Sequence, residues 1–275
     1  MSATSGTMTG RELDPGIRLS FWHLVSSEWI KLRSLRSTES AYIIIIVMSI
    51  GMALLMAGNI TGPASPEQAI PHEAQARLIA GTTVFGVYFG QLVVVVLGVL
   101  VISGEYTTGM IRSTLTAAPK RLPALWAKGL VLFVTTFVVG LISTVGAILA
   151  VMPILAGQGI TASLLDPDVY QPALNGALYL ALLSAFGLGV GTMLRSSAGG
   201  IAVALGVLLL LPTLWMLIPY DWARDATAYL LPNAGADFFG AGDNGLEYWQ
   251  SLLVILAWIA VSLAGAAALL KRRDA

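Results

Sequence analysis

Six long apolar segments dominate the 275-residue chain and constrain its fold more than any other feature. A helix that crosses the hydrocarbon layer of a bilayer needs about 20 predominantly apolar residues. Only 11% of the residues are charged, whereas roughly 25% is typical of soluble domains. The segments that qualify are 41–58, 79–103, 123–156, 173–194, 198–218 and 251–270. The sequence therefore predicts an all-α membrane protein with six transmembrane helices.

The distribution of charge along the chain predicts the orientation of these spans. Of the 15 Lys and Arg residues, 13 lie on one predicted side of the membrane, and the exceptions are Arg77 and Arg224. The 13 lie before the first span, after the sixth span, in or next to the connection of the second and third spans, and in the connection of the fourth and fifth spans. Most of the acidic residues lie in the other connections. Because basic loops are retained in the cytoplasm during insertion, we expect both termini to be cytoplasmic. The expected location is therefore a membrane, which the chain crosses several times.

Residues 1–17 are expected to form a disordered cytoplasmic tail, and residues 18–38 an amphipathic helix before the transmembrane domain, 39–275. One broad face of this helix carries Phe21, Leu24, Val25, Trp29, Leu32 and Leu35, and the other carries His23, Ser26, Ser27, Lys31 and Ser34. A helix with Trp and Leu opposite cations lies in the membrane interface. Two roles are open: the helix only anchors the chain, or it also supports a cytoplasmic partner.

Glu28 is the unusual residue of this helix, because its side chain projects within the apolar arc. Two kinds of partner are compatible with its position: Lys31, one turn further on, or a cation from another segment. The candidate functional residues of the interfacial helix are therefore Glu28, Trp29, Lys31 and Arg33.

The connection between the second and third spans, 104–120, is the densest polar stretch of the chain. Gly104 is expected to end or kink the second span. The following residues fit a short helix that begins at Thr107 or Thr108 and stops at Pro119. Its apolar ridge would comprise Met110, Ile111, Thr114 and Leu115. A short amphipathic helix at this position either lies on anionic headgroups or docks in a groove of a soluble protein.

This connection also carries a family resemblance. The stretch SGEYTTGMIRSTLTAAPKR, together with the earlier SSEWIKLRSLRST, resembles the permease subunits of type-2 ABC exporters, especially those of actinobacteria. The family pattern Glu-Tyr-x-x-Gly-x-Ile-Arg-x-x-Leu, then Pro and a basic residue, corresponds to Glu105, Tyr106, Gly109, Ile111, Arg112, Leu115, Pro119 and Arg121. YLLPNAGADF, residues 229–238, is similar to the external segment before the last span of that family.

The resemblance implies that 104–120 is a coupling loop, which docks in a cleft of a separate ATPase subunit. The residues implied in docking are Glu105, Tyr106, Thr108, Gly109, Met110, Ile111, Arg112 and Leu115. Glu105 would pair with Lys31 or Arg33 of the interfacial helix, or would instead be a solvated carboxylate at the membrane surface. The implied partners are two ATPase subunits, which use ATP and Mg, a second permease subunit that makes a homodimer or a heterodimer, and membrane lipid.

Several other classes of function are disfavoured by the sequence. It contains no cysteine and no G-x-x-x-x-G-K-[ST] motif, so we expect neither a Cys-based metal site nor a P-loop for ATP in this chain. Charged residues are essentially absent from the predicted spans, which argues against a pump with a buried carboxylate relay. No catalytic, cofactor or metal site is predicted, and the net charge of zero does not indicate a nucleic-acid partner.

The resemblance implies that the chain functions as a permease subunit of an ATP-driven exporter and is not itself an enzyme. An ATP-independent carrier or a scaffold protein is the alternative. Export as the direction of transport, and a bacterial plasma membrane as the location, follow only from the resemblance.

Glycine and aromatic residues give weaker indications. Gly86 and Gly90 have the GxxxG spacing at which two helices approach closely, so they are candidates for helix packing, and a contact between two subunits is one form that it could take. The stretch 187–191, GLGVG, either packs closely against another helix or loosens its own helix as a hinge. The aromatic residues of the external segment, 219–249, contribute either to the interfacial belt or to a short helical lid.

Overall fold

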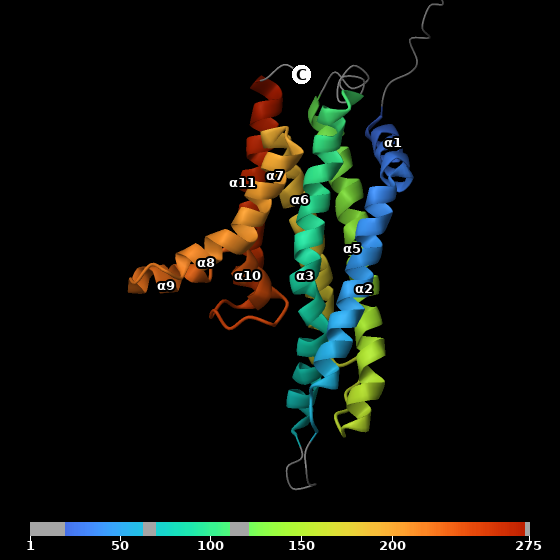
Figure 1. Ribbon diagram of the computed structural model, residues 1–275, viewed down its shortest axis with the longest axis vertical. Helices are drawn as coiled ribbons and strands as arrows, with labels where there is room; N and C mark the ends of the chain where they lie inside the picture. The colour runs from blue at the N-terminus through green and yellow to red at the C-terminus, as the bar shows by residue number, and fades with distance from the viewer. Residues whose placement is uncertain (1–19, 63–69, 111–120, 273–275) are drawn as a thin grey trace, which may run out of the picture.

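The computed structural model of the protein describes residues 20–62, 70–110 and 121–272, and these residues form a bundle of long helices without a β-strand (Figure 1). Six helical segments are long and apolar enough to cross a membrane. They are α2 (Arg36–Gly58), α3 (His72–Thr107), α5 (Arg121–Gly157, from Leu122), α6 (Pro167–Leu194), Ser197–Trp215 and α11 (Tyr248–Arg272). The predicted all-helical, six-span fold of a multi-pass membrane protein is confirmed.

The helices extend beyond the apolar segments that predicted them. α3 contains 36 residues and α5 contains 37. At a rise of 1.5 Å per residue, each is about 55 Å long, so each projects well past a hydrocarbon layer of about 30 Å. The second span does not end at Gly104, which was one of two expectations for this residue, because α3 continues through it to Thr107.

α3 and α6 pack against each other along much of their length and form the centre of the bundle. α2 and α5 lie on one side of this pair, and α11 packs on α6 on the other (Figure 1). The core between them is apolar and aromatic, and its fully buried members include Val87, Val95, Tyr179, Leu183 and Phe239. Because lipid tails are as apolar as these side chains, close packing rather than hydrophobic burial must hold such helices together.

Small residues provide that close packing. A Cβ atom at Gly86 would lie 2.4 Å from the Cα atom of Ser49, so α2 and α3 are in direct backbone contact there. A Cβ atom at Gly187 would lie 2.4 Å from the carbonyl oxygen of Val95, so α6 approaches α3 equally closely. Gly86 and Gly90 are both buried within the chain. Both glycines thus serve close packing between helices, as their spacing predicts, but they pack within one chain rather than between two subunits, and 187–191 is a further packing surface.

The fifth span is irregular. It consists of α7 (Ser197–Leu205), the π-helix η2 (Gly206–Leu210) and α8 (Leu211–Trp215). Pro212 lies just beyond the π-helix. Because proline has no amide hydrogen and its ring collides with the preceding turn, it disturbs regular α-helical bonding at this point.

Two short helices, α9 (Asp221–Thr227) and α10 (Leu231–Phe238), follow this span, and Figure 1 shows α8 and α9 directed sideways out of the bundle. Phe238 and Phe239 are buried, and Phe239 packs against Tyr179, so neither belongs to an aromatic belt. Trp222 and Trp249 remain exposed, as residues of such a belt would be.

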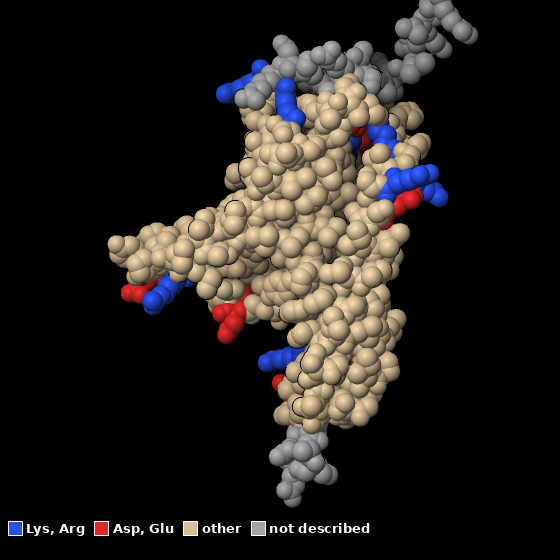
Figure 2. All heavy atoms as spheres, in the orientation of Figure 1, with Lys and Arg blue, Asp and Glu red and all other residues tan. Residues whose placement is uncertain are grey.

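The helix directions separate the charges of the chain onto two ends of the bundle. One end, here called the basic end, contains α1 (Phe21–Ser34), the end of α3, the start of α5, the α6–α7 turn and the end of α11 (Figure 1). Figure 2 shows basic side chains gathered at this end and acidic side chains mostly lower on the molecule. The predicted orientation would place the basic end in the cytoplasm.

Candidate functional site: a buried charge cluster at the basic end

α1 lies against α5 at the basic end, and it presents only part of the predicted apolar face, Val25 and Leu32, to the bundle. Glu28 and Leu32 are buried on this side, and Lys31 is half-buried beside them. Trp22 and Trp29 are exposed on the outside of the helix. Lys31 was assigned to the polar outer face, and this assignment is wrong, because the helix turns its charged pair inward.

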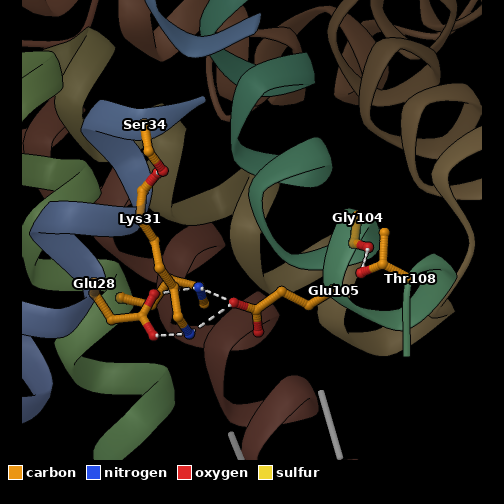
Figure 3. Close-up of polar contacts among 7 residues, drawn as sticks. Glu28, Lys31, Ser34, Gly104, Glu105 and Thr108 are labelled. Atoms are coloured by element: carbon orange, nitrogen blue, oxygen red, sulfur yellow. Dashed lines mark hydrogen bonds and ion pairs between the residues drawn. The ribbon is translucent and has the colours of Figure 1, made fainter. Parts of the chain in front are cut away.

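Three helices bring four charged side chains together at this point (Figure 3). Glu28 and Lys31 come from α1, Glu105 from the last turn of α3, and Lys128 from the second turn of α5. These four residues are called the charge cluster below.

The charges of the cluster alternate in sign around a closed ring. The Lys31 ammonium lies 2.8 Å from Glu28 Oε1 and 3.2 Å from Glu105 Oε1. The Lys128 ammonium lies 2.9 Å from Glu105 Oε1 and also donates to Glu28 Oε2. Each ammonium therefore contacts both carboxylates, and each carboxylate contacts both ammonium groups.

Three members of the cluster are almost completely removed from solvent. The side chains of Glu28, Glu105 and Lys128 are 6%, 9% and 6% exposed, whereas that of Lys31 is 28% exposed. Removing an ion from water costs several kcal/mol, which a buried partner offsets only in good geometry. The second oxygen of Glu105, Oε2, is buried without a hydrogen-bond partner among the described residues. The cluster therefore depends on all four charges being present.

The cluster tests the predictions made for the two carboxylates. Glu28 has both of the partners that were considered, Lys31 one turn on and Lys128 from another segment. Glu105 pairs with Lys31, as one alternative proposed, and its burial excludes the solvated alternative. Arg33 was the other suggested partner of Glu105, and it is instead exposed on the outer side of α1.

Sequence reasoning missed Lys128. The predicted spans were described as essentially free of charge, which is wrong for this residue, because it lies within α5 and is 5% exposed. A lysine a few residues inside an apolar segment is itself a signal, since such a residue usually faces the protein interior and a partner.

The pKa of Lys31 lies above its ordinary value. Burial acts to lower it, but the hydrogen bond and the negative charge of Glu28, followed by those of Glu105, outweigh burial and favour the charged form. α1 lies outside the six spans, where these charges meet both solvent and protein.

A second set of contacts ties the end of α3 to the α6–α7 turn. The Arg195 guanidinium lies 5.3 Å from the centre of the Tyr106 ring, which is within the range of a cation–π contact. Arg195 ends α6 in the left-handed conformation, with φ of 52°. Ser103 lies one turn before Tyr106 on α3, and its hydroxyl oxygen is 2.8 Å from that of Ser197 in the α6–α7 turn. The end of α3 is thus held by the charge cluster on one side and by the α6–α7 turn on the other.

The predicted docking residues continue from this end of α3. Glu105 and Tyr106 are in its last turn, Thr108 caps it, and Gly109 leaves the helix with φ of +73°. Only glycine adopts this conformation without strain, so the backbone geometry alone explains why a glycine occupies position 109. Met110 follows and is 47% exposed. Ile111, Arg112, Leu115 and Pro119 lie outside the described residues.

The cluster offers ion pairing and hydrogen bonding, not a metal-binding constellation. Within the described ranges, no group of three or more His, Asp and Glu residues could hold a metal ion. Neither a scan against protein-family models nor a search of the curated proteins finds a match to this chain. The fold alone defines the class, a six-span helical membrane protein.

Proposed function

We propose that the chain is the membrane-spanning permease subunit of an ATP-driven exporter of the type-2 ABC class. In this proposal a separate ATPase docks on the loop 104–120, and two permease subunits, identical or paralogous, line one transport path. The observation that carries the proposal is the charge cluster, which joins the helix entering this loop to two other helices.

The charge cluster supports a mechanical role for the loop. α3 is continuous over 36 residues, so a force applied after Thr107 acts on a long rigid element. Glu105 transmits that force to α1 and α5 through Lys31 and Lys128. Tyr106 and Ser103 transmit it to the α6–α7 turn. Movement of the loop would therefore shift several helix ends together.

In this mechanism the chain performs no covalent chemistry. ATP and Mg would bind to the ATPase partner, whose closure would move the loop and open the path. The motif around Glu105 and the basic character of this end of the bundle both support the assignment, because the loop must face the cytoplasm to meet an ATPase.

The direct test is affinity capture of the full chain from its own cells in a mild detergent. We expect a P-loop ATPase subunit to copurify, and its hydrolysis rate to depend on the permease. Arg112→Glu should abolish this coupling and leave membrane insertion intact. Lys271→Glu, at the exposed end of α11, is a matched control that should not affect it.

Two results would contradict the proposal. Recovery of the chain without any ATPase would favour the ATP-independent carrier or the scaffold. Transport that proceeds equally with and without nucleotide in vesicles would favour the carrier alone.

A further inference from the structure

A polar cavity lies on the far side of the spans from the charge cluster. It has a volume of about 380 Å³, within the range of roughly 300–1,000 Å³ that is usual for ligand sites. Its walls come from the first turns of α3 and α6, the end of α10 and Tyr248, the first residue of α11. Polar and charged residues form much of its lining, whereas the cavity between α2, α3 and η2 is almost entirely apolar.

Three charged residues line this cavity, and two of them have side chains without a partner among the described residues. Arg77 comes from α3 and Asp168 from α6, and both are exposed. In the described part of the chain, neither side chain takes part in an ion pair or a hydrogen bond, and the ion pair of this region joins His72 to Asp166 instead. The guanidinium and the carboxylate are therefore available to a ligand in the cavity.

Asp237, the third charged residue, holds a carboxylate that is fixed in place and poorly compensated. Its Oδ1 atom accepts hydrogen bonds from the backbone nitrogen and the Nδ2 atom of Asn244, at 3.1 and 3.0 Å. Its Oδ2 atom is buried and has no hydrogen-bond partner among the described residues. Asn175 Nδ2 donates to the carbonyl oxygen of Phe238 at 2.8 Å, which ties α6 to the end of α10. A partly buried carboxylate with so few donors attracts a cation in the adjoining cavity.

The cavity lies where the headgroup layer of a membrane would meet the bundle. α11 begins at Tyr248, and the predicted second span begins at Ile79, two residues after Arg77. Both α3 and α11 are long and apolar enough to span a membrane. A ligand can therefore reach the cavity either from water or from the surrounding leaflet.

The charges of this region favour a ligand that carries both signs. Glu73, Asp243 and Glu247 are exposed on the same segments and add negative charge around the cavity. Figure 2 shows acidic side chains above a hollow on this flank of the molecule and a basic side chain below it. A simple anion would face two lining carboxylates, and a simple cation would face the lining guanidinium. A zwitterion satisfies both.

We propose that this cavity binds an ethanolamine phosphate group, in which two carbons join a primary ammonium to a phosphate. The ammonium lies between the carboxylates of Asp168 and Asp237. The phosphate lies against the guanidinium of Arg77, whose planar fork of donors matches phosphate oxygens. The group belongs either to the headgroup of a phospholipid in the adjoining leaflet or to a soluble compound. Binding requires no ATPase partner, so the inference is independent of the transport function.

The first measurement is isothermal titration calorimetry of the full chain in a mild detergent. The probes are phosphoethanolamine, ethanolamine and methyl phosphate. We expect phosphoethanolamine to bind at least about tenfold more tightly than either of the other two, because each of these lacks one charge-assisted contact.

Native mass spectrometry of the same preparation identifies the source of the group. Phosphatidylcholine has the same phosphate as phosphatidylethanolamine, but its quaternary ammonium has no N–H donor for a carboxylate. Binding of phosphatidylethanolamine about tenfold more tightly than of phosphatidylcholine would assign the site to a lipid headgroup. Binding of phosphoethanolamine without binding of either lipid would assign it to a soluble compound. Both results support the proposal.

Two variants test the lining residues. Arg77→Gln and Asp168→Asn should each weaken the binding of phosphoethanolamine about tenfold. Both residues are exposed, so neither change should move the unfolding temperature by more than a few degrees. Arg224→Gln and Asp243→Asn are the matched controls, because they make the same changes at exposed residues that do not line the cavity. The controls should leave the affinity unchanged.

Three results would overturn the proposal. Ethanolamine that binds as tightly as phosphoethanolamine would make the cavity a site for simple cations. Unchanged affinity in both Arg77→Gln and Asp168→Asn would place the ligand elsewhere on the molecule. Failure of both phosphoethanolamine and phosphatidylethanolamine to bind would remove the site altogether.

Discussion

Replacement of Lys128 by methionine removes one corner of the charge cluster and keeps the length and apolar stem of the side chain. Glu28 and Glu105 would then share a single ammonium, that of Lys31, in a region where both carboxylates are at least nine-tenths buried. Taking one partner from a buried ion pair costs about 3–5 kcal/mol. Because Lys31 is partly exposed and a cavity adjoins the cluster, we expect a loss at the lower end, about 3 kcal/mol.

The measurement is reversible unfolding of the full chain in mild detergent, followed by helical circular dichroism. Lys271→Met is the matched control, since it makes the same change at an exposed residue in the last turn of α11. It should alter the free energy of unfolding by less than about 0.5 kcal/mol.

A double variant separates the charge effect from a packing effect. Glu28→Gln combined with Lys128→Met leaves one carboxylate facing one ammonium, so the double variant should be more stable than the sum of the single losses predicts. Coupling of about 1–3 kcal/mol is typical of residues in one network. A single loss below about 1 kcal/mol, or additive losses in the double variant, would refute the reasoning.

Three further predictions concern other contacts. Gly86→Ala should destabilise the bundle by about 1–3 kcal/mol, because the new Cβ atom would lie 2.4 Å from a Cα atom of α2. Gly81→Ala is the control, because a Cβ atom there would have no neighbour within 4 Å. In the same unfolding assay it should be neutral or stabilising by up to about 1 kcal/mol. Arg195→Ala and Arg195→Gly both lose the contact with Tyr106, but only glycine relieves the strain of the left-handed backbone at this position. Thermal melts should therefore show the Ala variant to be less stable than the Gly variant by about 1 kcal/mol. Because the pKa of Lys31 is raised, the stability that this residue contributes is fully present below its unfolded-state pKa and is lost as pH rises through its folded-state pKa. Thermal melts from about pH 9 upwards should therefore show a loss of stability that the Lys31→Gln variant lacks. The same pH dependence in both proteins would contradict the ion pairing.

The sequence by itself determined the class of fold. Apolar length is a local property, and helical hydrogen bonds close within four residues, so segments such as 79–103 and 173–194 could be recognised without knowledge of their neighbours. The helix before the first span was recognisable for the same reason. The odd position of Glu28 on that helix also indicated a partner, because a carboxylate among apolar residues requires one.

The arrangement at the basic end was decided only by the tertiary structure. Glu28 and Lys128 are 100 positions apart, and nothing local indicates that α1 and α5 bring them into contact. The contacts of Gly86 with α2 and of Arg195 with Tyr106 likewise depend on the rotation and depth of each helix. In a membrane, rotation and depth are set by close packing between helices, because apolar surface alone favours lipid and protein neighbours almost equally.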